Sequence, residues 1–314
     1  MRVVVTGGAG FLGSFLCESL VSRGDPVLCL DNLSTGRLPN ISHLLDFSNF
    51  EFMEADVSDE IRVKGNVDVV AHFASPASPQ AYLSRPLETL AVGSRGTENA
   101  LQLAARHKAR FILASTSEVY GSSAVHPQPE DYWGNVNPIG PRSAYNEAKR
   151  FAEALTMAYR KAKAVDTGII RIFNTYGPRM AADDGRVVTT FITQALNGDS
   201  LTVYGTGSQT RSLCYVDDLV WGILAMIDSA EPGPINLGNP KEISVAGIAQ
   251  LILAITRSQS SIVYRPLPQD DPSRRCPQIT LAEELLGWCP KISVEEGVRR
   301  TVAWFQGRPD EFMR

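Results

Sequence analysis

Short apolar runs alternate with longer amphipathic stretches along the first half of the chain. The alternation predicts strands and helices in turn. The strands fall at residues 2–6, 26–31, 67–73, 110–115 and 167–173, and the helices at residues 11–23, 87–107 and 145–163. Near-continuous apolar runs such as residues 67–71 are typical of strands buried on both faces. The pattern therefore predicts an α/β fold with a doubly wound parallel sheet.

The regular alternation of predicted strands and helices ends after residue 174. A helix is predicted at residues 187–197, a strand or helix at 213–229 and a strand at 234–239. From residue 244 a helix, a short strand at 261–264, a Pro-rich loop and a terminal helix follow. We therefore expect one domain from residues 1–174 and 213–242, and a smaller α/β lobe from residues 175–212 and 243–314.

Composition narrows the function classes. The 314 residues carry 30 Lys and Arg against 34 Asp and Glu, so no basic field attracts nucleic acid. The five cysteines form no CxxC pair and have no ligand spacing with the four histidines, which predicts neither a disulfide framework nor a metal site. No leader pattern precedes the first strand, and no run approaches the ~20 apolar residues of a membrane span. We expect a cytoplasmic protein.

A glycine-rich turn joins the first strand to the first helix. Gly7, Gly10 and Gly13 allow a tight turn and a close approach of the backbone to a pyrophosphate, which the helix N-terminus favours. Asp31 ends the second strand 18 residues beyond Gly13, where a carboxylate binds the ribose hydroxyls of NAD and repels a 2′-phosphate. The turn predicts bound NAD. Arg37 leaves NADP as an alternative, and a glycine turn without a ligand is another.

Tyr145 and Lys149 are four residues apart on one predicted helix face. A phenol with a pKa near 10 is a weak base, but a nearby ammonium and the positive nicotinamide ring favour the phenolate. Such a tyrosine takes a proton from a hydroxyl as hydride leaves the same carbon. The hydroxyls of Thr116 and Ser117 lie about 30 residues upstream and are expected to orient the substrate oxygen.

These features together resemble the extended short-chain dehydrogenase/reductase family of sugar-nucleotide enzymes. The resemblance rests on the glycine turn, Asp31, the Tyr145–Lys149 pair and residues 173–178 (Phe-Asn-Thr-Tyr-Gly-Pro), and it spans essentially the whole chain. Longer strings resemble the UDP-glucuronate decarboxylases of that family. They are residues 74–79 (Ala-Ser-Pro-Ala-Ser-Pro), 115–121 (Ser-Thr-Ser-Glu-Val-Tyr-Gly), 125–134, 136–142, 171–180, 201–205 and 207–211.

The resemblance implies a Rossmann-type fold, an NAD cofactor and UDP-glucuronate as substrate. It also implies oxidation at C4, decarboxylation and reduction to UDP-xylose, with UDP-4-keto-pentose released where the reduction fails. The catalytic residues implied are Tyr145, Lys149, Thr116, Ser117, Glu118 and Arg275. Those implied for the cofactor are Gly7, Gly10, Phe11, Leu12, Gly13, Asp31, Asn32, Asp56, Val57, Ala74, Tyr145, Lys149 and Phe173. Those implied for the substrate are Tyr82, Asn174, Arg179, Arg186, Tyr204, Arg211 and Arg275.

Glu118 separates the reactions this family performs. A 4,6-dehydratase would carry an Asp-Glu pair where this chain has Ser117 and Glu118, and a 4-epimerase typically lacks the glutamate. A UDP-sugar 4-epimerase or a 4,6-dehydratase remains the alternative, and an NAD-sensing regulatory protein is a non-enzymatic one. The chain departs from the family at Gly93, usually Asn, and at Asn146, usually acidic. The predicted helices at 87–107 and 145–163 resemble the pair through which the family forms homodimers.

Overall fold

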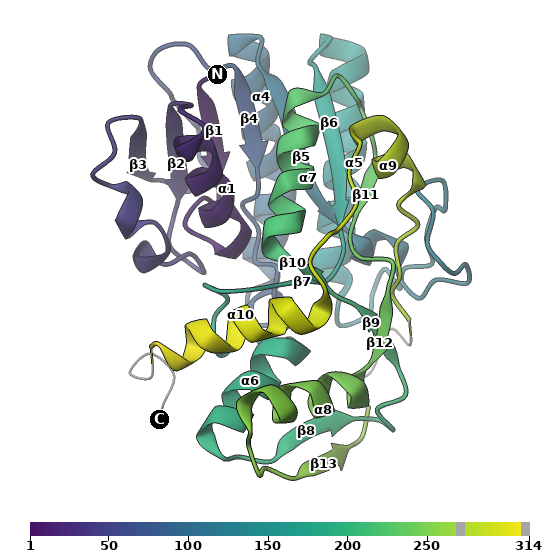
Figure 1. The fold of residues 1–314 in the computed structure, drawn as a ribbon. Coiled ribbons are helices and arrows are strands. Elements are labelled where there is room, and N and C mark those ends of the chain that lie inside the picture. The colour runs from purple at the N-terminus through teal and green to yellow at the C-terminus, as the bar shows by residue number, and fades with distance from the viewer. Residues whose placement is uncertain (268–273, 309–314) are drawn as a thin grey trace.

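A seven-stranded parallel sheet forms the centre of the computed structural model, which describes residues 1–267 and 274–308 (Figure 1). The strand order is β11-β6-β5-β4-β1-β2-β3, and each neighbouring pair is parallel. In register, Val5 of β1 lies between Cys29 and Ala71. The strands are β1 (Val3–Thr6), β2 (Val27–Asp31), β3 (Phe50–Glu54), β4 (Val69–His72), β5 (Arg110–Thr116), β6 (Thr167–Ile172) and β11 (Ile235–Leu237).

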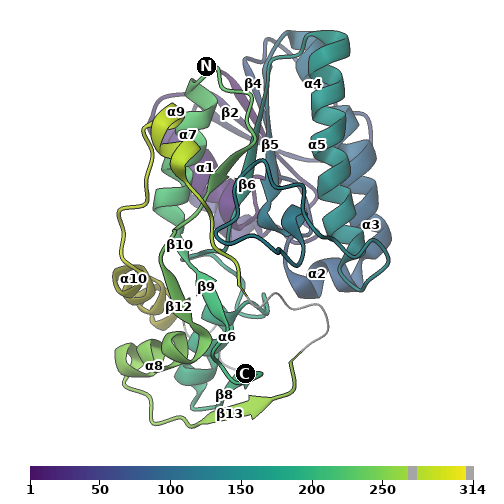
Figure 2. The ribbon, with the colours of Figure 1, turned by 90° about the vertical axis from the view of Figure 1, so that its right-hand side faces the viewer.

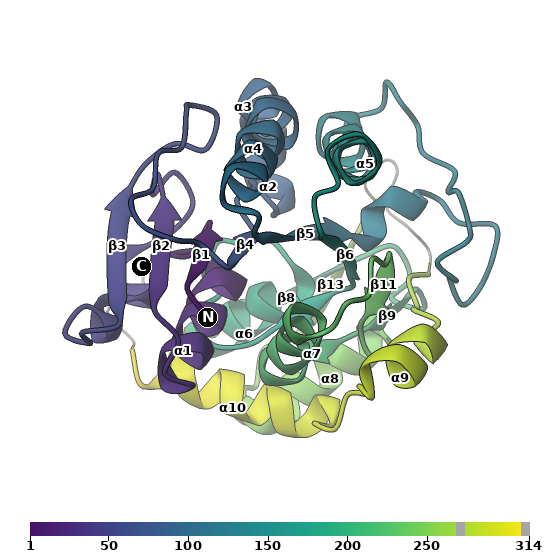
Figure 3. The ribbon, with the colours of Figure 1, turned by 90° about the horizontal axis from the view of Figure 1, so that it is seen from above.

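Helices cover both faces of the sheet, as the view from above shows (Figure 3). One face carries α1 (Phe11–Ser22), α7 (Val216–Asp228) and α9 (Thr280–Leu286), and the other carries α3 (Pro86–Ala91), α4 (Thr97–His107) and α5 (Ser143–Lys163). The apolar side chains of alternate strand positions pack into a separate core on each face. The predicted doubly wound α/β class is confirmed.

Three elements of this half differ from the predictions. The helix expected at residues 87–107 contains a π-helical turn (Val92–Gly96) between α3 and α4. Strand β3 was not predicted, because its short Phe-Glu-Phe-Met-Glu sequence mixes apolar and charged residues without a regular alternation. The short helix α2 (Pro79–Ser84), capped by Ser78, was also not predicted.

The second lobe lies below the carboxyl edge of the sheet (Figures 1 and 2). Its apolar core includes Phe191, Ile248 and Val298. The elements around this core are α6 (Val187–Asn197), β8 (Leu201–Tyr204), α8 (Val245–Thr256), β13 (Ile262–Arg265) and α10 (Val294–Gln306). Two-stranded pairs join it to the sheet, namely β7 (Thr175–Tyr176) with β10 (Cys214–Tyr215) and β9 (Thr210–Ser212) with β12 (Glu242–Ser244).

Helix α9 corrects one part of the predicted domain division. Residues 243–314 were all expected in the second lobe, but Ile279, Ala282 and Trp288 pack in the core between the sheet and α7. The indole of Trp288 donates a hydrogen bond of 2.8 Å to the carbonyl oxygen of Asp218 on α7. The segment around α9 therefore belongs with the sheet, because its apolar residues complete that core.

The described helices lack the combination of length and apolar character that crossing a membrane requires. All five cysteines are free thiols, and four of them are buried.

Candidate functional site

One cleft of about 1330 Å³ follows the carboxyl ends of β1, β2, β4, β5 and β6 and continues into the second lobe. Every residue predicted for catalysis, cofactor or substrate lines it. On the sheet side these are Gly7, Gly10, Phe11, Leu12, Gly13, Asp31, Asn32, Asp56, Val57, Ala74, Tyr82, Thr116, Ser117, Glu118, Tyr145, Lys149, Phe173 and Asn174. From the remaining segments come Arg179, Arg186, Tyr204, Arg211 and Arg275.

The glycine turn after β1 leaves no space for side chains. Gly7 has a φ of +71°, and a Cβ there would lie 2.7 Å from the backbone of Ala74. A Cβ at Gly13 would lie 2.1 Å from the carbonyl oxygen of Gly7. The first turn of α1 thus approaches the cleft with its backbone, and its N-cap residue, Gly10, supplies no side-chain hydrogen bond. This arrangement fits a pyrophosphate, which the free N–H groups of a helix N-terminus bind.

Asp31 lies at the end of β2 and is buried. It accepts hydrogen bonds from the backbone N–H groups of Ala9 (2.9 Å) and Leu33 (2.8 Å). Burial raises the pKa of Asp31, and these hydrogen bonds oppose the rise. Asn32 donates a hydrogen bond of 2.8 Å to Asp56, which links two more of the predicted cofactor residues. Arg37, the residue that left NADP open, lies 3.7 Å from Asp183.

Tyr145 and Lys149 lie on adjacent turns of α5 and are both buried. The ammonium of Lys149 donates a 2.8 Å hydrogen bond to the carbonyl oxygen of Ala114 on β5. The phenol of Tyr145 hydrogen-bonds with Thr116. Its ring stacks on Tyr82, with ring centroids 4.8 Å apart and planes 9° from parallel. Neighbours on two other elements, β5 and α2, therefore fix the orientation of the phenol.

The pKa of Tyr145 differs from the expectation. Burial raises it to about 12, more than the hydrogen bond with Thr116 and the charge of Arg186 lower it. Lys149 was expected to lower that pKa, but burial lowers the pKa of the lysine itself to about 8. The protein groups alone therefore hold the phenol protonated at neutral pH.

Glu118 follows β5 in a 3₁₀ turn (Ser117–Tyr120) and lies between two arginines. Arg275 is 3.2 Å from one carboxylate oxygen and Arg142 is 3.6 Å from the other. Arg275 is 2% exposed and also donates hydrogen bonds to the carbonyl oxygens of Ser117 (3.0 Å) and Gly121 (2.9 Å). Arg275 was expected to meet the substrate directly, and the structure adds that it holds the turn carrying Glu118. Arg142 was not predicted as a site residue, although it ends the quoted string 136–142.

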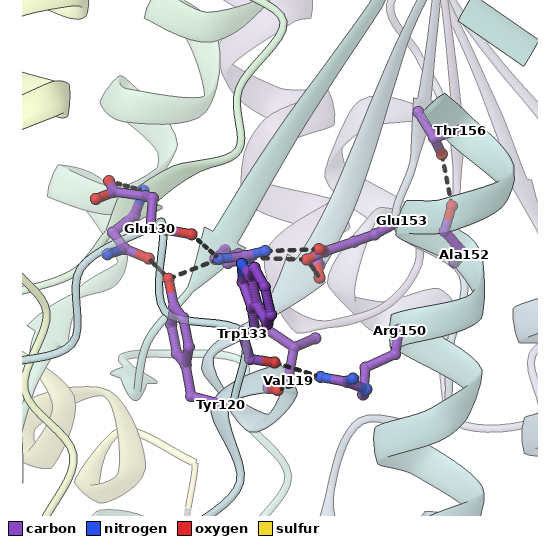
Figure 4. Close-up of polar contacts among 11 residues, drawn as sticks. Val119, Tyr120, Glu130, Trp133, Arg150, Ala152, Glu153 and Thr156 are labelled. Atoms are coloured by element: carbon purple, nitrogen blue, oxygen red, sulfur yellow. Dashed lines mark hydrogen bonds and ion pairs between the residues drawn. The ribbon is translucent and has the colours of Figure 1, made fainter. Parts of the chain in front are cut away.

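A partly buried polar network contacts this turn on the side of β6 and α5 (Figure 4). Arg171 on β6 forms two hydrogen bonds with the carboxylate of Glu153 on α5, at 2.8 and 3.0 Å. It also donates to the phenol oxygen of Tyr120 at 2.9 Å, while Ser115 donates to Glu153 at 2.6 Å. Sequence reasoning did not find this network, because it joins residues from β5, β6 and α5 without a recognisable spacing.

The arginines of the substrate end differ in how they are held. Arg186 forms an ion pair of 3.0 Å with Asp184 and faces the carbonyl oxygen of Ala77. Arg211 donates a hydrogen bond of 2.8 Å to the carbonyl oxygen of Thr210. Arg179 pairs with Glu18 on α1 and lies 4.3 Å over the ring of Phe15. Arg179 is therefore the predicted substrate arginine whose guanidinium group contacts α1.

Comparison with known proteins identifies the family of the chain. Residues 3–238 match the model of the NAD-dependent epimerase/dehydratase family. The chain is 50% identical to UDP-glucuronic acid decarboxylase 1 of Danio rerio over 97% of its own length and 72% of that protein's. It is 50% identical to UDP-glucuronic acid decarboxylase 2 of Arabidopsis thaliana over 98% of its length and 69% of that protein's.

A solved structure shares the fold at lower identity. The dTDP-glucose 4,6-dehydratase of Streptomyces venezuelae, solved with NAD bound, superposes with a TM-score of 0.91 at 26% identity, over 100% of this chain and 99% of that one. The glycine turn, Asp31 and the Tyr145–Lys149 pair fit NAD in this chain as well. The chain belongs to the NAD-dependent epimerase/dehydratase family.

Proposed function

We propose that this chain decarboxylates UDP-glucuronate to UDP-xylose, with NAD as its bound cofactor. The 50% identity to UDP-glucuronic acid decarboxylases over nearly the whole chain supports the reaction. The observation in the structure that carries the proposal is the position of Glu118. Its carboxylate lies close enough to Tyr145 to affect the pKa of the phenol, and two arginines flank it.

Tyr145 is the proposed proton acceptor at the substrate C4 hydroxyl. When bound, NAD supplies the acceptor and later the donor of the C4 hydride, and its positive ring favours the phenolate that the protein groups alone disfavour. Thr116 orients the phenol and the C4 oxygen through its hydroxyl. Lys149 adds positive charge behind the phenol, since a pKa of about 8 leaves its ammonium largely protonated at neutral pH.

The residues around Glu118 are proposed to serve the loss of CO₂. A ketone at C4 is β to the C6 carboxylate, so breaking the C5–C6 bond releases CO₂ and leaves an enolate over C4 and C5. Protonation at C5 and reduction at C4 then give the pentose. Preorganised cations stabilise charge that develops in a transition state, and Arg142 and Arg275 are the cations nearest Glu118 among the described residues that line the cleft. Glu118 is placed to move the C5 proton, directly or through water.

The other binding roles are proposed for residues that line the cleft. Asp31 binds the adenosine ribose, with Asp56 and Val57 beside the adenine, and the turn at Gly7–Gly13 receives the pyrophosphate. Arg186 and Arg211 bind the UDP diphosphate as charge-assisted hydrogen-bond donors, and Tyr204 borders the uridine. Tyr82 and Asn174 contact the sugar.

Incubation with UDP-glucuronate and NAD⁺ tests the proposal. We expect one CO₂ for each UDP-glucuronate consumed and UDP-xylose as the main nucleotide sugar, measured by CO₂ capture and liquid chromatography with mass spectrometry. UDP-galacturonate without CO₂ would assign a 4-epimerase instead. Conversion of UDP-glucose to a 4-keto-6-deoxy sugar would assign a dehydratase. A sample shown to contain NAD that changes none of these substrates would overturn the enzymatic assignment.

The chain is also proposed to form a homodimer through α3 and α5, which pack side by side. Leu87 and Leu90 on α3 are 80% and 41% exposed, and Phe151 on α5 is 50% exposed. Neighbouring exposed apolar side chains of this size are typical of an interface. A cytoplasmic location is proposed because the five cysteines are free thiols, as a reducing compartment would keep them.

A further inference from the structure

Three potential metal ligands from distant parts of the chain meet outside the cleft. They are His126, which follows the turn carrying Glu118, Glu242 on β12, and Cys276. Their ligand atoms all lie within 4.8 Å of one another, and the imidazole Nε2 of His126 is 2.9 Å from a carboxylate oxygen of Glu242. Sequence spacing predicted no metal site, because 116 residues separate the first two ligands and 34 more precede the third.

The backbone around these three residues is held in place by its own hydrogen bonds. Strand β12 pairs with β9, so that Glu242 lies opposite Ser212, and both strands lie between the sheet and the lower lobe (Figure 1). Gln128 donates its backbone N–H to the carbonyl oxygen of Cys276, and its side-chain oxygen accepts from the N–H of Cys276, each at 2.8 Å. The segments that carry the three ligands are therefore fixed relative to one another.

A second layer of contacts orients the ligand atoms. The hydroxyl of Thr210 donates a hydrogen bond to one oxygen of Glu242 and leaves the other oxygen facing His126. The thiol of Cys276 donates a hydrogen bond of 3.3 Å to the carbonyl oxygen of Pro240. Outer contacts of this kind commonly orient metal ligands and tune their affinity.

Metal binding requires the thiol of Cys276 to lose its proton, and a divalent cation then neutralises the thiolate and the carboxylate of Glu242 together. The side chains of His126 and Glu242 are 32% and 26% exposed, which leaves solvent access to the site and room for both to rotate.

We propose that His126, Glu242 and Cys276 bind one zinc ion, with water as the fourth ligand. Imidazole nitrogen, carboxylate oxygen and thiolate sulfur are the ligands that zinc takes in proteins, and three of them leave one tetrahedral position open. Tetrahedral coordination requires ligand atoms about 3.5 Å apart, so the set closes slightly around the ion. None of the three lines the cleft, so the zinc site is separate from the site for NAD and substrate.

The proposed zinc site lies next to the arginine that pairs with Glu118. Cys276 directly follows Arg275, whose guanidinium group holds the turn from Ser117 to Gly121 and pairs with Glu118. A zinc ion would link this segment to β12 and to the chain around His126. The ion would thereby restrain Arg275 through the adjacent Cys276, without contacting the substrate.

Titration of the metal-depleted full chain with Co²⁺, followed by competition with Zn²⁺, tests the proposal. Co²⁺ bound to a thiolate gives a charge-transfer absorption band that binding to oxygen and nitrogen alone does not give. We expect this band for the wild type and for Cys289→Ser, the matched control at an exposed free cysteine. We expect Cys276→Ser to abolish the band, and His126→Gln and Glu242→Gln each to weaken Zn²⁺ binding about tenfold or more.

A measurement on the unaltered chain removes any dependence on the folding of the variants. Zn²⁺ is expected to slow alkylation of Cys276 at least about tenfold while leaving the rate at Cys289 unchanged, as measured by peptide mass spectrometry. The proposal is overturned if the wild type gives no thiolate band and Zn²⁺ leaves alkylation of Cys276 unchanged. It is also overturned if the band is lost in Cys289→Ser but kept in Cys276→Ser, or if Zn²⁺ binds the wild type, Cys276→Ser and His126→Gln with equal affinity.

Discussion

Tyr145 combines a buried phenol with neighbours that fix its direction. The stacked ring of Tyr82 and the hydroxyl of Thr116 hold it, while burial alone would keep it protonated. As the proposed base, Tyr145 would therefore depend on the positive charge of a nicotinamide ring bound beside it. This dependence suits a base that would be needed only when cofactor and substrate are both in the cleft.

Tyr145→Phe is expected to reduce kcat about 100- to 10,000-fold, the usual contribution of a positioned general base. The substitution removes only the hydroxyl, so the stacking on Tyr82 and the affinity for NAD should persist. Steady-state kinetics and calorimetric titration with NAD⁺ measure the two quantities. Tyr159→Phe, on the same helix and outside the cleft, is the matched control and should keep kcat. An unchanged kcat in Tyr145→Phe would remove this residue as the base.

His72 on β4 gives a test of stability against pH. Burial, with the charge of Lys149, lowers its pKa from 6.5 to about 3. Between these values the unfolded chain binds a proton that the folded chain does not bind, so the free energy of unfolding falls as the pH falls. Urea unfolding at pH 6.0 and 5.0 should show a loss of up to about 1.4 kcal/mol from this residue. His72→Gln should show a shallower dependence, and equal slopes in the two proteins would contradict the assignment.

Residues of the site were predictable where the chemistry requires a fixed spacing along one element. The glycine turn and the Tyr145–Lys149 pair are of this kind. The contacts of Glu118 with Arg142 and Arg275 could not be derived from spacing, since Arg275 lies 157 residues beyond Glu118. Burial lowers the pKa of Lys149, and this burial depends on tertiary contacts that no local sequence pattern predicts.

The crossing of the π-helical turn with α5 sets the position of the catalytic helix. Gly93 lies against Ala148, between Tyr145 and Lys149 in the sequence, and a Cβ at residue 93 would lie 2.5 Å from the Cβ of Ala148. An asparagine, which the resemblance to the family implies at this position, would therefore require α5 to move. Glycine at residue 93 allows the π-helical turn to pack closely against α5. The sequence alone did not give this reason.

Gly93→Ala is expected to destabilise the fold by about 1–3 kcal/mol, because the added methyl overpacks the crossing. Ala148→Gly should cost about 1 kcal/mol, as glycine does inside a helix. In the double variant the space is restored, so its loss should be smaller than the sum of the two single losses. Urea unfolding of the four proteins gives the coupling. Additive losses would show that the two residues do not compete for the same space.

Elements were predicted well where the apolar period is long and uniform, and less well at edges and short connections. Helix α6 occupies the predicted residues 187–197, and α5 begins two residues before its predicted start. The edge strand β3 is only five residues long, and the seven-residue helix α9 offers too few turns for a clear period. The placement of α9 depends on which core has room for Trp288, a tertiary property.

At the scale of the whole molecule, the cleft lies between two halves, the sheet and the second lobe, which share apolar contacts. Apolar cores lie on both faces of the sheet, and the core of the second lobe also contains Val216 and Val220 of α7. Arg179 links the halves through its ion pair with Glu18 on α1. The outer face of α3 and α5 lies away from the second lobe (Figure 2), so an interface there leaves the cleft accessible.

Phe151→Glu and Leu87→Glu are expected to convert the proposed homodimer into a monomer, because each introduces a charge into an apolar interface without a partner. Sedimentation velocity at several protein concentrations should show one species near twice the chain mass of 34.2 kDa for the wild type and one near that mass for the variants. Leu285→Glu, at a 45% exposed leucine on α9 across the sheet, is the matched control and should remain dimeric. A monomeric wild type, or a dimer that both variants leave intact, would rule out this interface. Since α5 carries Tyr145 on its inner face, dimer formation would also restrain the helix that positions the base, and the variants should lose thermal stability together with the dimer.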